Sequence, residues 1–589
     1  MGFRLGRART QPVRTHGSAE GGIGIPSPAA LPGSFFAPQN LANITGRGTS
    51  LPDSGHGGNA VASALQALGV ERIFALSGGH IFPIFDGCKN AGIDIVDVRH
   101  EQSAGYAAEG SARLARSLGV ACVTAGPGVT NVVSPLAQAS FNAAPVLVLG
   151  GRAPAFRWGQ GSLQEIDHVP FVDPIARAQT VADTTAITEY VVAAGVQALT
   201  PPRGPTFLDF PLDVLFNQTE FKRPDTPAVE VADVDEAAPS KVAATLEGSE
   251  RPVLIAGSNV WLDRSEDALR ALAEKLRIPV FMNGQGRGCL PADHELAFAR
   301  SRSTALGDAD VVVVAGTPID FRLGFGANFA AGAEVIHLDS HPDSISTHAS
   351  PAVSIGAPLN RTLEAICYAT DGPLETKAWL DTLQVAEEKK SQAAESELRS
   401  NALPIHPMRI YGELVPLLER DAIVIGDGGD FVSYAGREVP SYTGGCWLDP
   451  GPFGCLGCGP GYAMAARVAH ADRQVVLLLG DGALGFSGME LESFVRHSLP
   501  VVCVVGNNGI WGLEKHPMKA IYGYDVAADL RPGIRYEQMM EAFGGRGEMV
   551  TEPDEVGPAL KRAFDSGEPY LVNVLTDSEV AYPRSANLA

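Results

Sequence analysis

The residues best suited to chemistry lie in the stretch Gly480–Asn508. An apolar run leads into Gly480-Asp481-Gly482, and a second apolar run ends at Asn507-Asn508. In a parallel sheet both runs deliver their carboxyl ends to one edge, so Asp481 and Asn508 should meet although 27 positions separate them. A carboxylate, an amide oxygen and a nearby backbone carbonyl suit Mg²⁺, and the glycines let backbone N–H groups approach a phosphate. The structural alternative is a βαβ unit whose glycines only form turns.

Glu101 is the second candidate. It follows an apolar run that ends at Val98, and it opens an Ala-rich helical stretch. Taken alone, Glu101 is best interpreted as a first-turn acid that complements the helix dipole. A carboxyl group buried among apolar neighbours can instead hold a proton near neutral pH and act in proton transfer. Two downstream features favour the catalytic interpretation, namely the segment TAGPGVTN (Thr124–Asn131) and the Asp481 motif.

Four segments together resemble the acetolactate synthase branch of the thiamine-diphosphate-dependent enzymes. They read VRHEQSAGYAAEG from Val98, TAGPGVTN from Thr124, PVLVLGGR from Pro145, and GDG followed by the paired asparagines. The similarity runs from about Gly55 to the C-terminus. It implies a pyrimidine-binding, a central and a diphosphate-binding α/β domain. It also implies a homodimer or homotetramer, because the family's active site lies between the first domain of one subunit and the third domain of another.

The resemblance assigns roles to individual residues. Glu101 would be the acid that activates thiamine diphosphate, while Asp481, Asn508 and the backbone oxygen of Ile510 would hold Mg²⁺. The bulky side chain of Leu456 would bend the cofactor. Many relatives carry Gln-His where this chain has Asp430-Phe431, so the contacts there depart from the family pattern. The cofactor-binding positions implied by the resemblance are Gly429, Asp430, Phe431, Gly454, Leu456, Gly480, Asp481, Gly482, Ala483, Asn508, Ile510 and Gly512.

His80 and Gln164 are further candidates for catalysis. His80 directly follows a strand-like run and Ser77-Gly78-Gly79, at the carboxyl end where α/β sheets bind ligands. Benzaldehyde-lyase-like carboligases resemble this segment and carry an active-site histidine at the position of His80. A loop histidine that only caps or packs is the structural alternative. Gln164 matches an active-site glutamine that is found in both lyases and synthases.

The central block has two Gly-containing loops after strand-like runs, Gly257-Ser258-Asn259 and Gly316–Arg322. In acetolactate synthases this domain binds FAD, whereas in oxalyl-CoA decarboxylases it binds ADP and contributes to the CoA site. Arg322 could contact such a ligand or lie on the surface. The resemblance therefore implies FAD, with ADP or CoA as the alternative.

Composition limits the class of protein. The chain has 589 residues, 45% of them apolar, and a net charge of −22, which argues against nucleic acid as a partner. No apolar run reaches the roughly 18 residues of a membrane span. Eight cysteines without framework spacing fit a reducing cytoplasm. Residues 1–50 are rich in Gly, Pro, Ser and Ala and have no acid before Glu20, which predicts a disordered extension or, alternatively, a transit peptide.

From about residue 55, strand-like runs alternate with Ala-rich helical stretches, which predicts parallel α/β sheets. We predict a pyrimidine-binding domain at 55–220, a central domain at 240–370 and a diphosphate-binding domain at 400–583. Lys222–Lys241 is typical of a linker, and residues 375–403 favour a charged helix. The predicted strands are Arg72–Leu76, Ile93–Val98, Val120–Ala125, Val146–Gly150, Pro252–Ala256, Pro279–Met282, Val311–Ala315, Glu334–Leu338, Ala422–Ile425, Val475–Leu479, Val501–Val505 and Tyr570–Val574.

These observations predict an enzyme that forms or cleaves C–C bonds with thiamine diphosphate and Mg²⁺. By resemblance it would decarboxylate pyruvate and ligate a second 2-oxo acid, as in branched-chain amino acid biosynthesis. Pro517 stands where synthases that prefer 2-oxobutyrate carry tryptophan, so that preference is not implied. The run Phe486–Glu490 looks instead like oxalyl-CoA decarboxylase and 2-hydroxyacyl-CoA lyase, which would take a 2-hydroxyacyl substrate. Outside these enzyme classes, the hypotheses are a non-catalytic partner of a true synthase and, more weakly, a nucleotide-dependent dehydrogenase.

Overall fold

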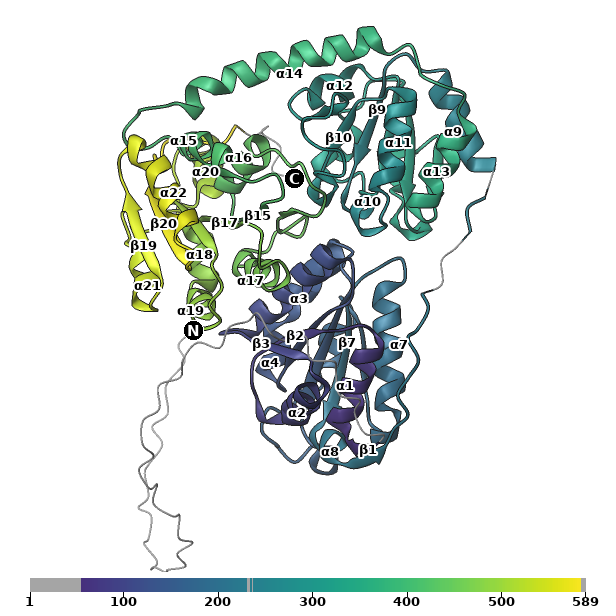
Figure 1. Ribbon diagram of the computed structural model, residues 1–589, viewed down its shortest axis with the longest axis vertical. Helices are drawn as coiled ribbons and strands as arrows, with labels where there is room; N and C mark the ends of the chain where they lie inside the picture. Colours follow the sequence, from purple (N-terminus) through teal and green to yellow (C-terminus); the bar gives the residue numbers. More distant parts are fainter. Residues whose placement is uncertain (1–53, 230–232, 236, 584–589) are drawn as a thin grey trace, which may run out of the picture. The chain divides into compact units, whose positions relative to one another are not determined.

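The computed structural model describes residues 54–229, 233–235 and 237–583. The predicted extension at residues 1–50 lies outside this range. Three six-stranded sheets, every pairing in them parallel, follow one another along the chain (Figure 1). The predicted fold class, three parallel-sheet α/β domains, is confirmed. Among the described residues no helix combines the length and the apolarity that crossing a bilayer requires.

The first sheet has the strand order β3-β2-β4-β5-β7-β6. Its central strand β4 is buried along its whole length, as expected for a parallel strand covered by helices on both faces. A short antiparallel pair, β1 (Ser54–His56) with β8 (Gln218–Glu220), joins the two ends of this domain. The strands are β2 (Arg72–Ala75), β3 (Asp94–Asp97), β4 (Gly119–Val123), β5 (Val146–Arg152), β6 (Arg177–Thr180) and β7 (Thr206–Pro211); the helices are α1 (Gly57–Ala67), α2 (Phe82–Ala91), α3 (Glu101–Ala115), α4 (Pro127–Asn131), α5 (Val133–Phe141), α6 (Val169–Val172), α7 (Ile187–Leu199) and α8 (Leu212–Phe216).

The central sheet has the order β11-β10-β9-β12-β13-β14 and its own apolar core. Its strands are β9 (Pro252–Ala256), β10 (Val280–Met282), β11 (Ala297–Phe298), β12 (Val311–Ala315), β13 (Glu334–Asp339) and β14 (Val353–Gly356); its helices are α9 (Ala237–Glu247), α10 (Ser258–Leu262), α11 (Glu266–Leu276), α12 (Arg302–Asp308) and α13 (Leu359–Ala369). The predicted linker Lys222–Lys241 ends earlier than expected, since α9 already begins at Ala237. The predicted charged helix is α14 (Lys377–Leu398).

The last sheet has the order β16-β15-β17-β18-β20-β19. From β15 the chain proceeds first to one side and then to the other, so β15 and β17 flank the point where the strand order reverses. Crevices at such points are the usual ligand sites of open α/β sheets. The strands are β15 (Ile423–Asp427), β16 (Trp447–Leu448), β17 (Val475–Gly480), β18 (Val502–Asn507), β19 (Arg546–Val550) and β20 (Tyr570–Leu575); the helices are α15 (Pro407–Leu414), α16 (Asp430–Glu438), α17 (Gly459–Ala469), α18 (Asp481–Ser487), α19 (Glu490–Arg496), α20 (Gly512–Tyr522), α21 (Glu537–Ala542) and α22 (Val556–Asp565).

Helices α3 and α17 pack against each other and join the first and last sheets into one continuous apolar core (Figure 1). The fully buried guanidinium of Arg113, on α3, lies at this junction. It donates to Glu109 Oε1 at 3.3 Å, to the Tyr462 hydroxyl at 3.1 Å and to the Asp449 carbonyl at 2.9 Å. Its Nε also donates to Gln285 Oε1 of the central block at 3.1 Å. Burial raises the pKa of Glu109, and the Arg113 charge opposes that rise. One buried cation therefore contacts all three parts of the chain.

Candidate functional site

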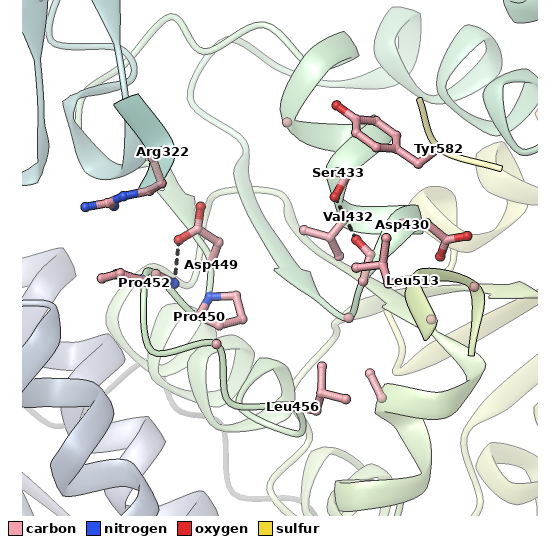
Figure 2. A pocket seen from close by; sticks show the side chains of 18 of the residues that line it. Arg322, Asp430, Val432, Ser433, Asp449, Pro450, Pro452, Leu456, Leu513 and Tyr582 are labelled. Atoms are coloured by element: carbon pink, nitrogen blue, oxygen red, sulfur yellow. Dashed lines mark hydrogen bonds between the residues drawn. The ribbon is translucent and has the colours of Figure 1, made fainter. Parts of the chain in front are cut away.

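A cavity of about 1160 Å³ opens at the carboxyl edge of the last sheet, where β15, β17 and β18 end (Figure 2). Eleven of the twelve expected cofactor positions line it: Gly429, Asp430, Gly454, Leu456, Gly480, Asp481, Gly482, Ala483, Asn508, Ile510 and Gly512. The twelfth, Phe431, is not in the lining. Its ring is buried, stacks near Tyr411 and occupies the space beside Gly506.

Asp481 is a buried acid in the lining of this cavity. In the sheet Gly480 pairs with Gly506, and Asp481 Oδ2 accepts from the Gly509 N–H at 2.8 Å, directly beside Asn508. Burial raises the pKa of Asp481 to about 6, although the N–H groups of Gly509 and Gly482 oppose that rise. A carboxylate held out of water in this way gains from a nearby cation.

The donor set fits Mg²⁺ in its chemistry. It offers one carboxylate from Asp481, one amide oxygen from Asn508 and the backbone at Ile510, all oxygen ligands, and such sites usually leave positions for water and phosphate. The described residues contain no cluster of three or more His, Cys, Asp or Glu side chains suited to a metal. Amide and carbonyl oxygens, rather than several acidic side chains, make up most of the proposed donor set.

The glycines leave room for a ligand against the backbone. A Cβ atom added at Gly480 or Gly454 would meet no atom within 4 Å and would project into free space. At Gly482 an added Cβ would lie 2.5 Å from the Trp511 ring, and at Gly512 it would lie 2.3 Å from Asp430 Oδ2. Gly428 has a φ of 130°, which side-chain-bearing residues rarely adopt. Bare backbone therefore lines the end of the cavity where a diphosphate would need close N–H donors.

Leu456 stands on a turn that a buried carboxylate fixes. The N–H groups of Gly457 and Gly459 donate to Asp427 at 3.0 and 2.8 Å, and the Cys455 N–H donates to Gln138 Oε1 at 3.0 Å. Burial raises the pKa of Asp427 to about 6 against these hydrogen bonds. In Figure 2 Leu456 projects from this turn, with Arg322 and Asp430 on opposite sides of the view. Sequence reasoning did not identify Asp427, and its position at the end of a buried strand was the available signal.

Glu101 begins α3, and its side chain is 7% exposed. Its Oε2 accepts a hydrogen bond from Asn131 Nδ2 at 3.0 Å. Asn131 belongs to the predicted TAGPGVTN segment, so the structure joins these two motifs. Within the described part of the chain, Glu101 does not line the cavity, and none of the lining residues comes from the first domain. Within one chain, the acid and the cavity do not form a single site.

Comparison with known proteins agrees with this geometry. The chain matches the thiamine pyrophosphate enzyme models for the N-terminal TPP-binding domain at residues 55–171, the central domain at 240–366 and the C-terminal TPP-binding domain at 427–574. The chain belongs to the thiamine pyrophosphate enzymes. The predicted family is thereby confirmed.

Individual relatives cover nearly the whole of this thiamine pyrophosphate enzyme. A probable acetolactate synthase of Mycobacterium bovis and the acetolactate synthase large subunit of Mycobacterium tuberculosis are each 51% identical to it, over 91% of this chain and 98% of theirs. The human 2-hydroxyacyl-CoA lyase 2 is 32% identical over 88% of this chain and 90% of its own. Both branches named by the resemblance are therefore found among the relatives.

In this thiamine pyrophosphate enzyme His80 and Gln164 lie at the same edge of the first sheet as Asn131. His80 is buried, and its Nδ1 lies 3.2 Å from Thr124 Oγ1. Burial lowers the pKa of His80, and a backbone hydrogen bond at Leu163 opposes the shift. Gln164 has a φ of 58° and packs against Gly126. Both side chains therefore lie against the loop Thr124–Asn131, whose last residue donates a hydrogen bond to Glu101.

A buried histidine–aspartate pair supports that loop, and sequence reasoning missed it. His168 Nε2 accepts from the Gly126 N–H at 2.9 Å, so its proton resides on Nδ1, which donates to Asp209 Oδ2 at 2.9 Å. Arg152 donates to the same oxygen at 2.8 Å. His168 lies 42 positions from Gly126 and 41 from Asp209, and no local pattern links them.

Replacing Asp481 by Ala should abolish Mg²⁺-dependent binding of thiamine diphosphate, because the site loses its one carboxylate. Since loss of an outer-shell partner alone costs about 10–100-fold in metal affinity, we expect a loss of about 100-fold or more. Isothermal calorimetry with and without Mg²⁺ measures it. Asp472→Ala, at an exposed aspartate just before β17, is the matched control. Undiminished cofactor affinity in Asp481→Ala would contradict the metal assignment.

Proposed function

We propose that this enzyme is of the acetolactate synthase type. It would bind thiamine diphosphate and Mg²⁺, release CO₂ from pyruvate and join the remaining two-carbon unit to a second 2-oxo acid, a step of branched-chain amino acid synthesis. The observation that carries the proposal is the cavity with buried Asp481 beside Asn508, in a chain 51% identical to acetolactate synthases along its length.

Residues from the last and first domains would hold the metal and the cofactor. Asp481, Asn508 and the Ile510 carbonyl would hold Mg²⁺, and the backbone at Gly429 and Gly480–Ala483 would bind the diphosphate. Leu456 would set the bend of the cofactor. When bound, thiamine diphosphate supplies a carbon nucleophile that adds to the substrate carbonyl and takes up the electrons of the cleaved C–C bond. Glu101 would share a proton with the aminopyrimidine N1′ atom, and Asn131 fixes the carboxyl for that task.

The position of Glu101 supports a homo-oligomer. The acid lies outside the cavity of its own chain, so a second copy would supply the cavity that it serves. Large apolar side chains of the first domain are about half exposed or more, which suits a face covered by another copy: Phe82, Phe156, Leu163, Phe171 and Phe216. The oligomer would be a homodimer or homotetramer. All eight cysteines are free thiols, which supports a reducing cytoplasm.

The second candidate function is that of a 2-hydroxyacyl-CoA lyase or a benzaldehyde-lyase-like carboligase. Identity of 32% to a lyase and the buried His80 beside Thr124 favour it.

Side-by-side assays separate these functions. The purified enzyme with thiamine diphosphate and Mg²⁺ should convert pyruvate to CO₂ and acetolactate, detected colorimetrically. Benzoin-type ketols and 2-hydroxyacyl-CoA should react far more slowly. Cleavage of the CoA thioester without reaction of pyruvate would transfer the proposal to the lyase branch.

Replacing Glu101 by Gln should leave cofactor binding intact but slow exchange of the cofactor's C2 proton by at least about 10²–10⁴-fold, the usual contribution of a positioned acid or base. An amide cannot share a proton with N1′. NMR of C2–H/D exchange in the bound cofactor measures the rate. A variant that exchanges at the parent rate would leave Glu101 as a helix-start acid only.

The same variant tests the shared site. Glu101→Gln and Asp481→Ala carry defects in different half-sites, so mixed oligomers contain some sites with neither defect. Mixing the two inactive proteins should restore part of the activity. If no activity returns although the subunits exchange, the sites do not lie between copies.

The proposal includes a nucleotide, FAD, at the carboxyl edge of the central sheet. Asp339 ends β13 there, is 1% exposed, and has Oδ1 held by Asn259 Nδ2 at 2.8 Å and by the Ser340 N–H at 2.7 Å. Its Oδ2 has no hydrogen-bond partner within the described part of the chain. Burial raises the pKa of Asp339 to about 6. An acid beside Gly turns at this edge suits a ribose hydroxyl, which FAD, ADP and CoA all offer.

Arg322 favours no single nucleotide. It lines the large cavity and pairs with Asp320 at 2.8 Å. If FAD is bound, the purified protein should be yellow, and acid precipitation should release free flavin. A colourless protein that ignores added FAD but is stabilised against heat by ADP or CoA would contradict the flavin and favour the lyase branch.

A further inference from the structure

A buried glutamate of the last domain holds the backbone in front of Glu101. Glu490, on α19, accepts hydrogen bonds from the N–H of Arg99 at 3.0 and 3.2 Å and from the N–H of His100 at 3.0 Å. These two residues directly precede α3, which begins at Glu101. The Glu490 side chain is 1% exposed, and Ser493 Oγ donates to its Oε2 at 2.7 Å.

This contact is part of a wider attachment of the same loop. Gln102 Nε2 donates to the Phe486 carbonyl at 3.2 Å, and Arg496 Nη2 donates to the Asp97 carbonyl at 3.2 Å. His497 Nε2 lies 2.8 Å from that same carbonyl. Among these contacts, Glu490 alone reaches the loop from a buried position with a charged acceptor. Hydrogen bonds to a charged group in such surroundings are about twice as strong as neutral ones.

Glu490 lies nine positions after Asp481, the proposed metal ligand. Asp481 begins α18, and Glu490 begins α19 after a break of two residues. One short segment, Asp481–Arg496, therefore has the carboxylate of the metal site at its start and the support of the β3–α3 loop at its end. In the proposed oligomer the two carboxylates would serve different half-sites.

We propose that Glu490 is a positioning residue for Glu101: its carboxylate fixes the Arg99–His100 backbone so that the Glu101 carboxyl is presented to the cofactor. The inference rests on the proposed role of Glu101. Loss of Glu490 would free the two N–H groups and let the start of α3 shift. Because a misplacement of about 1 Å can cost up to about 10²-fold in rate, small shifts at Glu101 are consequential.

The experiment compares Glu490→Ala, Glu490→Gln and Glu490→Asp in the full chain. Glu490→Ala should slow C2–H/D exchange of bound thiamine diphosphate by roughly tenfold or more. Mg²⁺-dependent cofactor affinity should stay within about threefold of the parent, because Asp481 is untouched. Glu490→Gln keeps an oxygen that can accept both N–H groups and should recover most of the rate. Glu490→Asp is one methylene too short and should not.

A second readout does not require the cofactor. Hydrogen–deuterium exchange of the peptide covering residues 97–103, measured in the cofactor-free protein, should rise in Glu490→Ala and return with Glu490→Gln. Glu541→Ala is the matched control, because Glu541 is an exposed glutamate on α21, outside the segment that contacts this loop. It should change neither readout.

The outcomes separate the two proposals. Parent-rate C2 exchange in Glu490→Ala, with Glu101→Gln slow, would overturn the inference and leave the function intact. Equal loss of C2 exchange and cofactor affinity would reduce Glu490 to a general structural residue. Parent-rate exchange in Glu101→Gln would refute the role of Glu101, and the inference would fall with it. If Glu490→Ala does not fold, the contrast between Glu490→Gln and Glu490→Asp decides the matter.

Discussion

The arrangement of this molecule depends on the buried contact between α3 and α17. Arg113 lies at its centre and donates to acceptors from the first, central and last parts of the chain. A buried ion pair adds little net stability, since desolvation offsets the attraction, but removing one partner costs about 3–5 kcal/mol. Because three of its four acceptors lie outside α3, the Arg113 guanidinium fixes how α3 lies on α17. The positions of Glu101, at the start of α3, and of the Leu456 turn, just before α17, follow from it.

Much of the fold could be predicted from the sequence because the decisive signals are local. The run Val475–Leu479 is apolar throughout, as fully buried parallel strands are, and it ends in glycines. Once two such strands are neighbours, the parallel register alone brings Asp481 to Asn508. Of the eleven cofactor positions that line the cavity, those that directly follow β17 and β18 are placed in this way. Phe431 is the exception, because it lies in the first turn of α16 with its ring buried in the core.

The missed residues share one physical property. Asp427, His168 and Glu490 each act by accepting backbone N–H groups from segments distant in the sequence. Glu490 and Arg99 are 391 positions apart. No periodicity or spacing records such a contact, because it exists only after domains pack. Asp427 had one local signal, its position at the end of a buried strand, whereas His168 and Glu490 had none. Positions that support a site are thus harder to predict than positions that line it.

The continuous core has a consequence for synthesis of the chain. The apolar cluster around α3 contains residues from Phe74 to Leu571, whereas the central sheet closes its core with residues from 242 to 383. As the polypeptide leaves the ribosome, the central domain can complete its core early. In the first domain the apolar face of α3 stays exposed until α17, more than 300 residues later in the chain, has been synthesised. Long-range closure of this kind is slow and leaves apolar surface exposed in the meantime. We therefore expect the nascent chain to depend on chaperones. A chain truncated after the central domain would keep the apolar face of α3 exposed and should aggregate.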